Sequence, residues 1–80
     1  MYGYSNQPSS MIRQPVASGN LQSVGYDPTS GILEIEFKNG SIYQYTGVPK
    51  GIYQELMTAP SHGKYHARYI RNRYPYSRIR

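Results

Sequence analysis

The sequence predicts an α+β fold in which a three-stranded antiparallel β-meander is followed by two C-terminal helices packed on one face of the sheet. Alternating apolar and polar residues, separated by turn sequences, occupy the first half of the chain. In the second half, apolar residues recur at helical spacing. A meander cannot bury its apolar face alone, so the helices are expected to cover it.

Three regions are expected along the 80 residues, which have room for one domain. Residues 1–15 are polar and contain two prolines, which predicts a disordered N-terminal arm. The folded domain is expected to cover residues 16–75. Residues 76–80 are expected to form a frayed basic tail.

Three strands are expected, at residues 20–26, 31–37 and 41–45. The sequence Asp-Pro-Thr-Ser-Gly separates the first two and is rich in turn-forming residues. In the second strand, three apolar residues alternate with two glutamates, which is typical of a half-buried antiparallel strand with one side facing water. These apolar residues are Leu33, Ile35 and Phe37.

The turn that follows Phe37 decides which way Tyr43 and Tyr45 of the third strand point. A two-residue turn would place both tyrosines on the glutamate side of the sheet. A three-residue turn with Gly40 in the left-handed conformation would place them on the apolar side. We prefer the second register because it gathers five large side chains on one face, although it is expected to leave Ile42 exposed.

Two helices are expected after the sheet. The first is expected to begin at Pro49 and to continue to about Thr58. The second is expected to be capped by Ser61 and to end near Tyr74. At 100° per residue, three basic residues share one side of the second helix and give it a basic outer face. These residues are Lys64, Arg68 and Arg71.

The basic charge is concentrated in the last third of the chain. The net charge is +5. Residues 1–48 hold two basic and three acidic residues, whereas residues 49–80 hold seven basic residues and one glutamate. This asymmetry suggests an anionic partner, with nucleic acid as the first candidate. The alternative is a charged tail that keeps a small, tyrosine-rich protein soluble.

Exposed cations and tyrosines near the C-terminus are the candidate RNA-binding residues. The cations would neutralise phosphates and the tyrosines would stack on unpaired bases. The candidate residues are Lys64, Arg68, Arg71, Arg73, Tyr74, Tyr76 and Arg78. The RNA would be tRNA or a single strand. The alternative partner is a protein bound through a sheet edge or the tyrosine-rich arm.

The chain resembles a known family in a series of short motifs that keep their order and spacing over roughly residues 16–74. They are residues 18–27, Leu33-x-Ile35-x-Phe37, Asn39-Gly40, Tyr43-x-Tyr45, Val48-Pro49, Tyr53, Leu56, Ala59-x-Ser61-x-Gly63-x-Tyr65 and Ile70. The family is the KTSC domain, named after the C-terminus of some lysyl-tRNA synthetases. The resemblance implies a small binding module of bacterial or phage origin, with RNA as the usual suggestion. The family places Phe-Asn where this chain has His66-Ala67.

Several function classes are not expected. There is no cysteine, and His62 and His66 have no further metal-binding residue nearby, so neither a metal nor another cofactor is expected. Glu34 and Glu36 share an open strand face, where nothing would tune them for catalysis, so we expect no enzyme and no small-molecule substrate. Without a signal peptide or a membrane-spanning segment, the chain is expected to be a cytoplasmic monomer.

Overall fold

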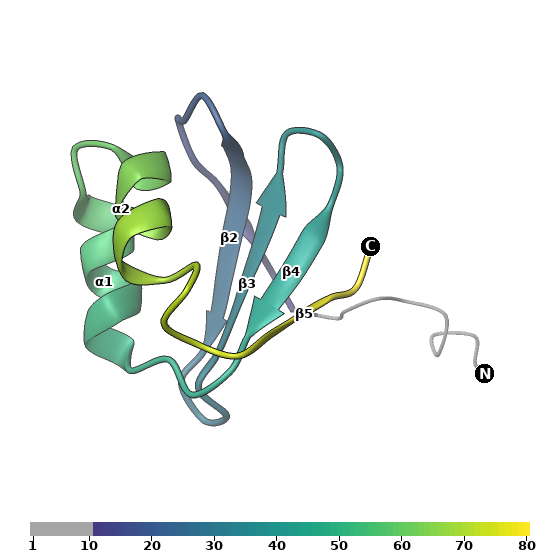
Figure 1. Cartoon of the computed structure of the whole chain (residues 1–80), viewed down its shortest axis with the longest axis vertical. Helices are drawn as coiled ribbons and strands as arrows, with labels where there is room; N and C mark the ends of the chain where they lie inside the picture. Colours follow the sequence, from purple (N-terminus) through teal and green to yellow (C-terminus); the bar gives the residue numbers. More distant parts are fainter. Residues whose placement is uncertain (1–10) are drawn as a thin grey trace.

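The computed structural model describes residues 11–80, in which two helices cover one side of an antiparallel sheet (Figure 1). Within these residues the sheet has five strands in the order β1-β2-β3-β4-β5, and each strand is antiparallel to its neighbours. The strands are β1 (Gln14–Pro15), β2 (Leu21–Asp27), β3 (Ile32–Phe37), β4 (Ile42–Tyr45) and β5 (Tyr76–Arg78). The helices are α1 (Lys50–Thr58) and α2 (His62–Tyr69). The α+β fold, with its central meander and two helices on one face, is confirmed.

The outer strands β1 and β5 differ from the expectation. They lie in the segments that the sequence assigned to the arm and the tail. Strand β5 is not frayed, because it pairs with the open edge of β4 and satisfies backbone groups there. The predicted disorder of residues 1–10 lies outside the described residues.

The hairpin between β3 and β4 has the preferred register. Ile35 lies opposite Tyr43, and Leu33 lies opposite Tyr45. Gly40 closes the three-residue turn with a φ of 93°, a conformation that L side chains rarely adopt. Both tyrosines therefore belong to the face that the helices cover.

The expected exposure of Ile42 is wrong. Its side chain is only 1% exposed. The C-terminal segment runs along β4 at this point, and the Ile79 N–H donates to the Ile42 carbonyl at 2.8 Å. The additional strand therefore covers an edge that a three-stranded sheet would leave open.

The hydrophobic core lies between the sheet and the two helices. Its buried members are Leu21, Val24, Leu33, Ile35, Tyr45, Val48, Leu56 and Ile70. Burying a leucine or isoleucine side chain completely stabilises the fold by about 1.5–3 kcal/mol. Tyr26 of β2 adds a contact to α1, because its ring stacks on Tyr53 at 4.8 Å between centroids.

Helix α2 is shorter than expected. Its N-terminus is as expected, because the Ser61 hydroxyl caps it by accepting from the Lys64 N–H at 3.2 Å. The helix ends at Tyr69 rather than Tyr74, and Ile70 turns into the core, where it is fully buried. Arg71 therefore leaves the helical side that it was expected to share with Lys64. Within residues 11–80, neither helix is long and apolar enough to cross a membrane.

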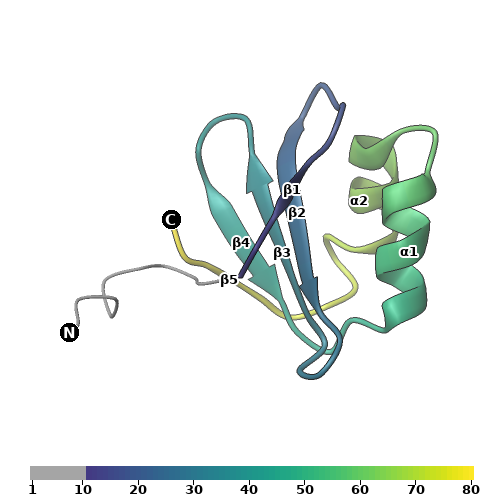
Figure 2. The ribbon, with the colours of Figure 1, turned by 180° about the vertical axis from the view of Figure 1, so that it is seen from behind.

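The sheet face opposite the helices is not the open, water-facing surface that the sequence suggested. Glu34 is fully buried there. Arg13 forms an ion pair with the Glu34 carboxylate, and Gln44 donates to the same group at 2.8 Å. Figure 2 shows this side of the molecule, where the N-terminal segment crosses in front of the sheet. A buried carboxylate is tolerated here because it has a cationic partner and a hydrogen-bond donor.

Glu36, two residues further along β3, extends this polar network. The Ser23 hydroxyl donates to one Glu36 oxygen at 2.8 Å, and Arg80 donates to the other at 3.0 Å. Arg13 also donates to the Ser23 hydroxyl at 3.0 Å. The two glutamates are thus neutralised by arginines from the two ends of the described chain.

Gly25 of β2 allows the N-terminal segment to cross the sheet closely. A Cβ atom at this position would lie 2.7 Å from the Ile12 carbonyl oxygen, too close for a real contact. We predict that Gly25→Ala lowers the free energy of unfolding by about 1–3 kcal/mol, because the segment that carries Arg13 must move. Urea unfolding of the purified variant measures this loss.

Gly51→Ala is the matched control for this substitution. A Cβ atom at Gly51, in α1, meets nothing within 4 Å. Alanine is favoured over glycine in a helix, so this variant should be as stable as the original protein or slightly more stable. Equal stability of the two variants would contradict the close crossing at Gly25.

Candidate functional site

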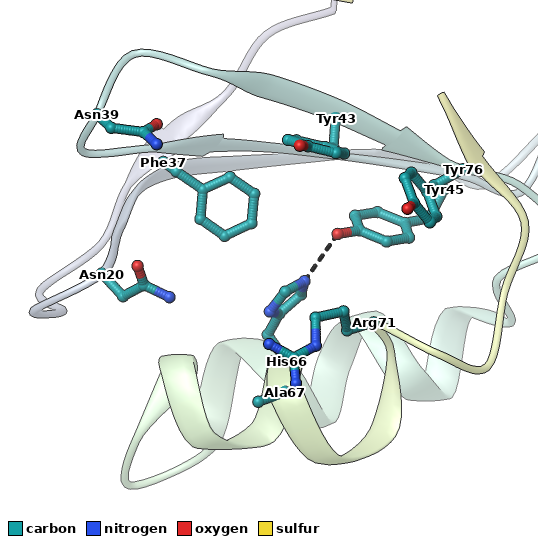
Figure 3. Close-up of a pocket in the computed structure, with 9 residues that line it drawn as sticks. All are labelled: Asn20, Phe37, Asn39, Tyr43, Tyr45, His66, Ala67, Arg71 and Tyr76. Carbon is teal, nitrogen blue, oxygen red and sulfur yellow. Dashed lines mark hydrogen bonds between the residues drawn. The ribbon is translucent and has the colours of Figure 1, made fainter. Parts of the chain in front are cut away.

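A hollow of about 300 Å³ opens between α2 and the helix-facing side of the sheet (Figure 3). Four aromatic side chains from β3, β4 and β5 line it, together with a histidine, an alanine, two asparagines and an arginine. They are Asn20, Phe37, Asn39, Tyr43, Tyr45, His66, Ala67, Arg71 and Tyr76. Segments far apart in the sequence therefore build one concave, largely aromatic surface.

The aromatic rings come from the hairpin register and from the pairing of β5. Tyr43 packs edge-on against Phe37, with 5.6 Å between their centroids. Tyr76 lies opposite Tyr45 in the β4–β5 pair, and its ring is 5.5 Å from Tyr43 and 5.8 Å from Tyr45. Tyr76 remains 56% exposed. It therefore offers an accessible ring beside the more buried ones.

Tyr45 and His66 form a buried polar pair across the hollow. The Tyr45 hydroxyl lies 2.8 Å from His66 Nε2, and the two residues are 2% and 4% exposed. Burial raises the pKa of Tyr45 to about 12. Burial, together with the nearby positive charge of Arg71, lowers the pKa of His66 to about 4. Both side chains are therefore neutral at pH 7.

Three further polar side chains stand around the hollow. Asn39 Oδ1 accepts hydrogen bonds from the Ser41 N–H and hydroxyl, which leaves the Asn39 NH₂ group without a partner in residues 11–80. The Asn20 side chain forms no hydrogen bond with any residue in that range. Figure 3 shows the Arg71 side chain beside His66 and Ala67. The hollow thus combines ring faces with unused hydrogen-bonding groups and one cation.

A second, shallower groove of about 260 Å³ lies where α1 and α2 meet. Its lining residues are Ala59, Pro60, Ser61, Lys64, Tyr65, Arg68 and Tyr69. The Tyr65 hydroxyl donates to Glu55 at 2.6 Å, and burial together with this carboxylate raises the pKa of Tyr65 to about 12. The Arg68 guanidinium lies 5.9 Å from the centroid of the Tyr69 ring. This groove is basic, but its floor is less aromatic than the hollow.

The structure divides the basic surface that the sequence treated as one side of a helix. Lys64 and Arg68 are exposed and line the groove, whereas Arg71 lines the hollow together with Tyr76. The division follows from the end of α2 at Tyr69. Helical spacing therefore grouped residues that the folded chain separates.

The other three candidates lie outside both concave sites. Arg73 and Arg78 are exposed, and neither lines the hollow or the groove. Tyr74 is half-buried and packs against the hydrophobic core. Its ring is therefore a packing element more than an exposed surface for stacking.

Sequence reasoning missed the hollow itself. It placed Tyr43 and Tyr45 in the core, and Tyr45 is indeed buried there, but half-buried Tyr43 also lines the hollow. The available signal was the pair His66-Ala67, where the resembled family has Phe-Asn. Both residues line the hollow.

The two histidines have separate partners. His62 Nδ1 lies 2.8 Å from the Leu56 carbonyl oxygen, whereas His66 Nε2 is bonded to Tyr45. In residues 11–80, no three histidine, cysteine, aspartate or glutamate side chains are grouped so that they could hold a metal ion.

Comparison with known proteins supports the resemblance. Residues 17–74 match the family model of the KTSC domain. An uncharacterized protein of Stutzerimonas stutzeri is 44% identical over 55 residues, which cover 69% of this chain and 78% of that protein. The crystal structure of a KTSC domain protein from Yersinia pestis superimposes with a TM-score of 0.83 at 40% identity, covering 89% of this chain and all of that one.

A third relative is much longer than this chain. The lysine–tRNA ligase of a Nostoc species is 36% identical over 78 residues, which cover 89% of this chain. The match spans 14% of the length of the ligase. The similarity therefore concerns one small segment of that enzyme.

The Tyr45–His66 pair makes stability depend on pH. His66 has a pKa of about 4 in the folded protein and an ordinary value of 6.5. Between these pH values His66 is protonated in the unfolded chain but neutral in the folded protein. The contribution of His66 to the free energy of unfolding is therefore complete above pH 6.5 and is lost as the pH falls towards 4. We predict that His66→Gln reduces the loss of stability over this interval by about 3 kcal/mol.

Urea unfolding of both proteins at a series of pH values measures the difference. His62→Gln is the control, because no buried hydrogen bond to a tyrosine depends on His62. If the original protein and His66→Gln lost stability in parallel as the pH fell, His66 would not be held neutral by the fold.

Proposed function

The chain belongs to the KTSC domain family, and we propose that it is a small non-catalytic module that binds single-stranded RNA. One observation carries this proposal. Five exposed cations on and after α2 form no ion pair with any aspartate or glutamate side chain in residues 11–80. They are Lys64, Arg68, Arg71, Arg73 and Arg78. Such cations are available to neutralise phosphates.

The basic residues on the opposite side of the sheet, in contrast, are paired with acidic ones. Arg13 and Arg80 are paired with Glu34 and Glu36, so these arginines compensate the acidic strand. Of the seven basic residues that form no ion pair in residues 11–80, five lie on α2 and the segments that follow it. An anion approaching the protein would therefore be attracted to that side.

Single-stranded RNA fits this surface better than a duplex. The exposed Tyr76 ring lines the hollow together with Arg71, and a base can stack on such a ring only when it is unpaired. The relatives named lysine–tRNA ligase add support, because these proteins handle RNA. The ligase reaction is not transferred to this chain, which matches only a small part of their length.

The arrangement of the carboxylates supports a non-catalytic role. Glu34 is held by Arg13 and Gln44, and Glu36 by Ser23 and Arg80. Neither acid is left free to exchange a proton with a substrate.

A protein partner bound at a sheet edge is less favoured by the structure. The outer strand β1 has two residues, and one of them is Pro15, which cannot donate a backbone hydrogen bond. The outer strand β5 has three residues. Both edges are short templates for pairing with another chain.

We predict that the protein binds single-stranded RNA with an affinity that falls steeply as salt is added. Arg71→Ala and Arg68→Ala should each reduce the slope of log affinity against log salt by about 1, because each removes a phosphate contact. Fluorescence anisotropy with a labelled RNA strand at low and moderate salt measures both quantities.

Lys50→Ala is the control for these variants. Lys50 is also exposed, but it lies at the start of α1, away from the proposed surface. Its removal should leave the slope unchanged. Failure of the original protein to bind at low salt, or an affinity insensitive to salt, would rule out the proposal.

A further inference from the structure

We propose that the hollow between α2 and the sheet receives one unpaired nucleobase of the bound strand. This inference rests on the proposed function and names the part of RNA that the hollow would take. The base would stack on the exposed Tyr76 ring, its edge would meet Asn20 and His66, and its phosphate would lie near Arg71. Phosphate binding alone would need only the cations, so the hollow adds a second and separable contribution.

The size and lining of the hollow fit one flat aromatic group. At about 300 Å³ it is at the lower limit of ligand-binding pockets, which run from about 300 to 1,000 Å³. Phe37, Tyr43 and Tyr45 supply apolar ring surface inside the hollow. The Tyr76 ring is exposed, so a base can reach it from solvent. Proteins recognise unpaired bases on such aromatic surfaces.

The unused hydrogen-bonding groups point to a ligand with a polar edge. His66 is 4% exposed, and only its Nε2 atom has a partner among residues 11–80, which leaves the buried Nδ1 atom unused. The buried Nδ1 atom of His66 without a partner is costly, and the edge of a base offers a donor that would satisfy it. The Asn20 side chain is exposed and also has no hydrogen bond in that range, so it is available at the rim of the hollow.

The charges around the hollow indicate different positions for the base and for its phosphate. His66 and Tyr45 are neutral at pH 7, so the inner part of the hollow has no charge with which to hold a phosphate. Arg71 is exposed, and among residues 11–80 it is the one cation that lines the hollow. This arrangement favours a neutral ring inside and an anionic group beside Arg71.

Two substitutions test the base in the hollow without altering the charge. Tyr76→Ala removes the accessible ring, and Ala67→Phe fills the hollow from the exposed surface of α2. The probes are a short adenine-only RNA and an abasic strand of the same length and charge. Each substitution should weaken binding of the adenine strand about tenfold, the effect expected for the loss of one stacked base, and leave the abasic strand unaffected.

Gln54→Ala is the control. Gln54 is exposed on α1 and lines neither the hollow nor the groove. This variant should bind the adenine strand as the original protein does. Thermal unfolding of the three variants and of the original protein establishes that all of them are folded.

The outcomes distinguish the two proposals. Suppose that both strands bind with salt-dependent affinity and that Tyr76→Ala and Ala67→Phe bind them as tightly as the original protein does. This result would contradict the proposal that a base enters the hollow, but it would agree with a phosphate-binding surface. An equal loss of affinity for the adenine and the abasic strand would also contradict this proposal, because the hollow would then not recognise the base. No binding of either strand at low salt would overturn both proposals.

Discussion

The register of the β3–β4 hairpin determines which side chains face the helices and where the hollow forms. The left-handed Gly40 closes a three-residue turn, and a turn one residue shorter would move every side chain of β4 to the opposite face. In the observed register, Tyr43 and Tyr45 join Phe37 beneath the helices. Tyr45 then reaches His66 on α2, and this hydrogen bond fixes the distance between sheet and helix where the hollow opens.

The two faces of the sheet consequently have different electrostatic roles. On one face, Glu34 and Glu36 are neutralised by arginines that come from opposite ends of the described chain, and Gly25 leaves room for the N-terminal crossing. On the other, the helices cover an aromatic surface. Five cations on and after α2 form no ion pair with an aspartate or glutamate in residues 11–80, namely Lys64, Arg68, Arg71, Arg73 and Arg78. Five of the nine basic residues of the chain therefore lie on α2 or after it without an aspartate or glutamate partner in residues 11–80.

The sequence was sufficient for the features that depend on local pattern. It predicted the register from the clustering of apolar side chains, and it predicted the Ser61 cap of α2 from a single hydroxyl residue. It did not reveal β1 and β5, because strands of two and three residues have no periodicity to detect. It also extended α2 too far, because helical spacing cannot show that Ile70 is drawn into the core. The hollow combines side chains from four separate segments, so only tertiary structure could show it.

A map of backbone amide chemical shifts during addition of single-stranded RNA to the ¹⁵N-labelled protein would locate the RNA-binding surface. We expect the shifts to concentrate on α2, the turn at Arg71 and strands β4 and β5, around Tyr43 and Tyr76. Amides near Glu34 and Arg13 that face the other side should stay unchanged. Shifts centred on the Arg13–Glu34 side, or an unchanged spectrum at low salt, would contradict this expectation.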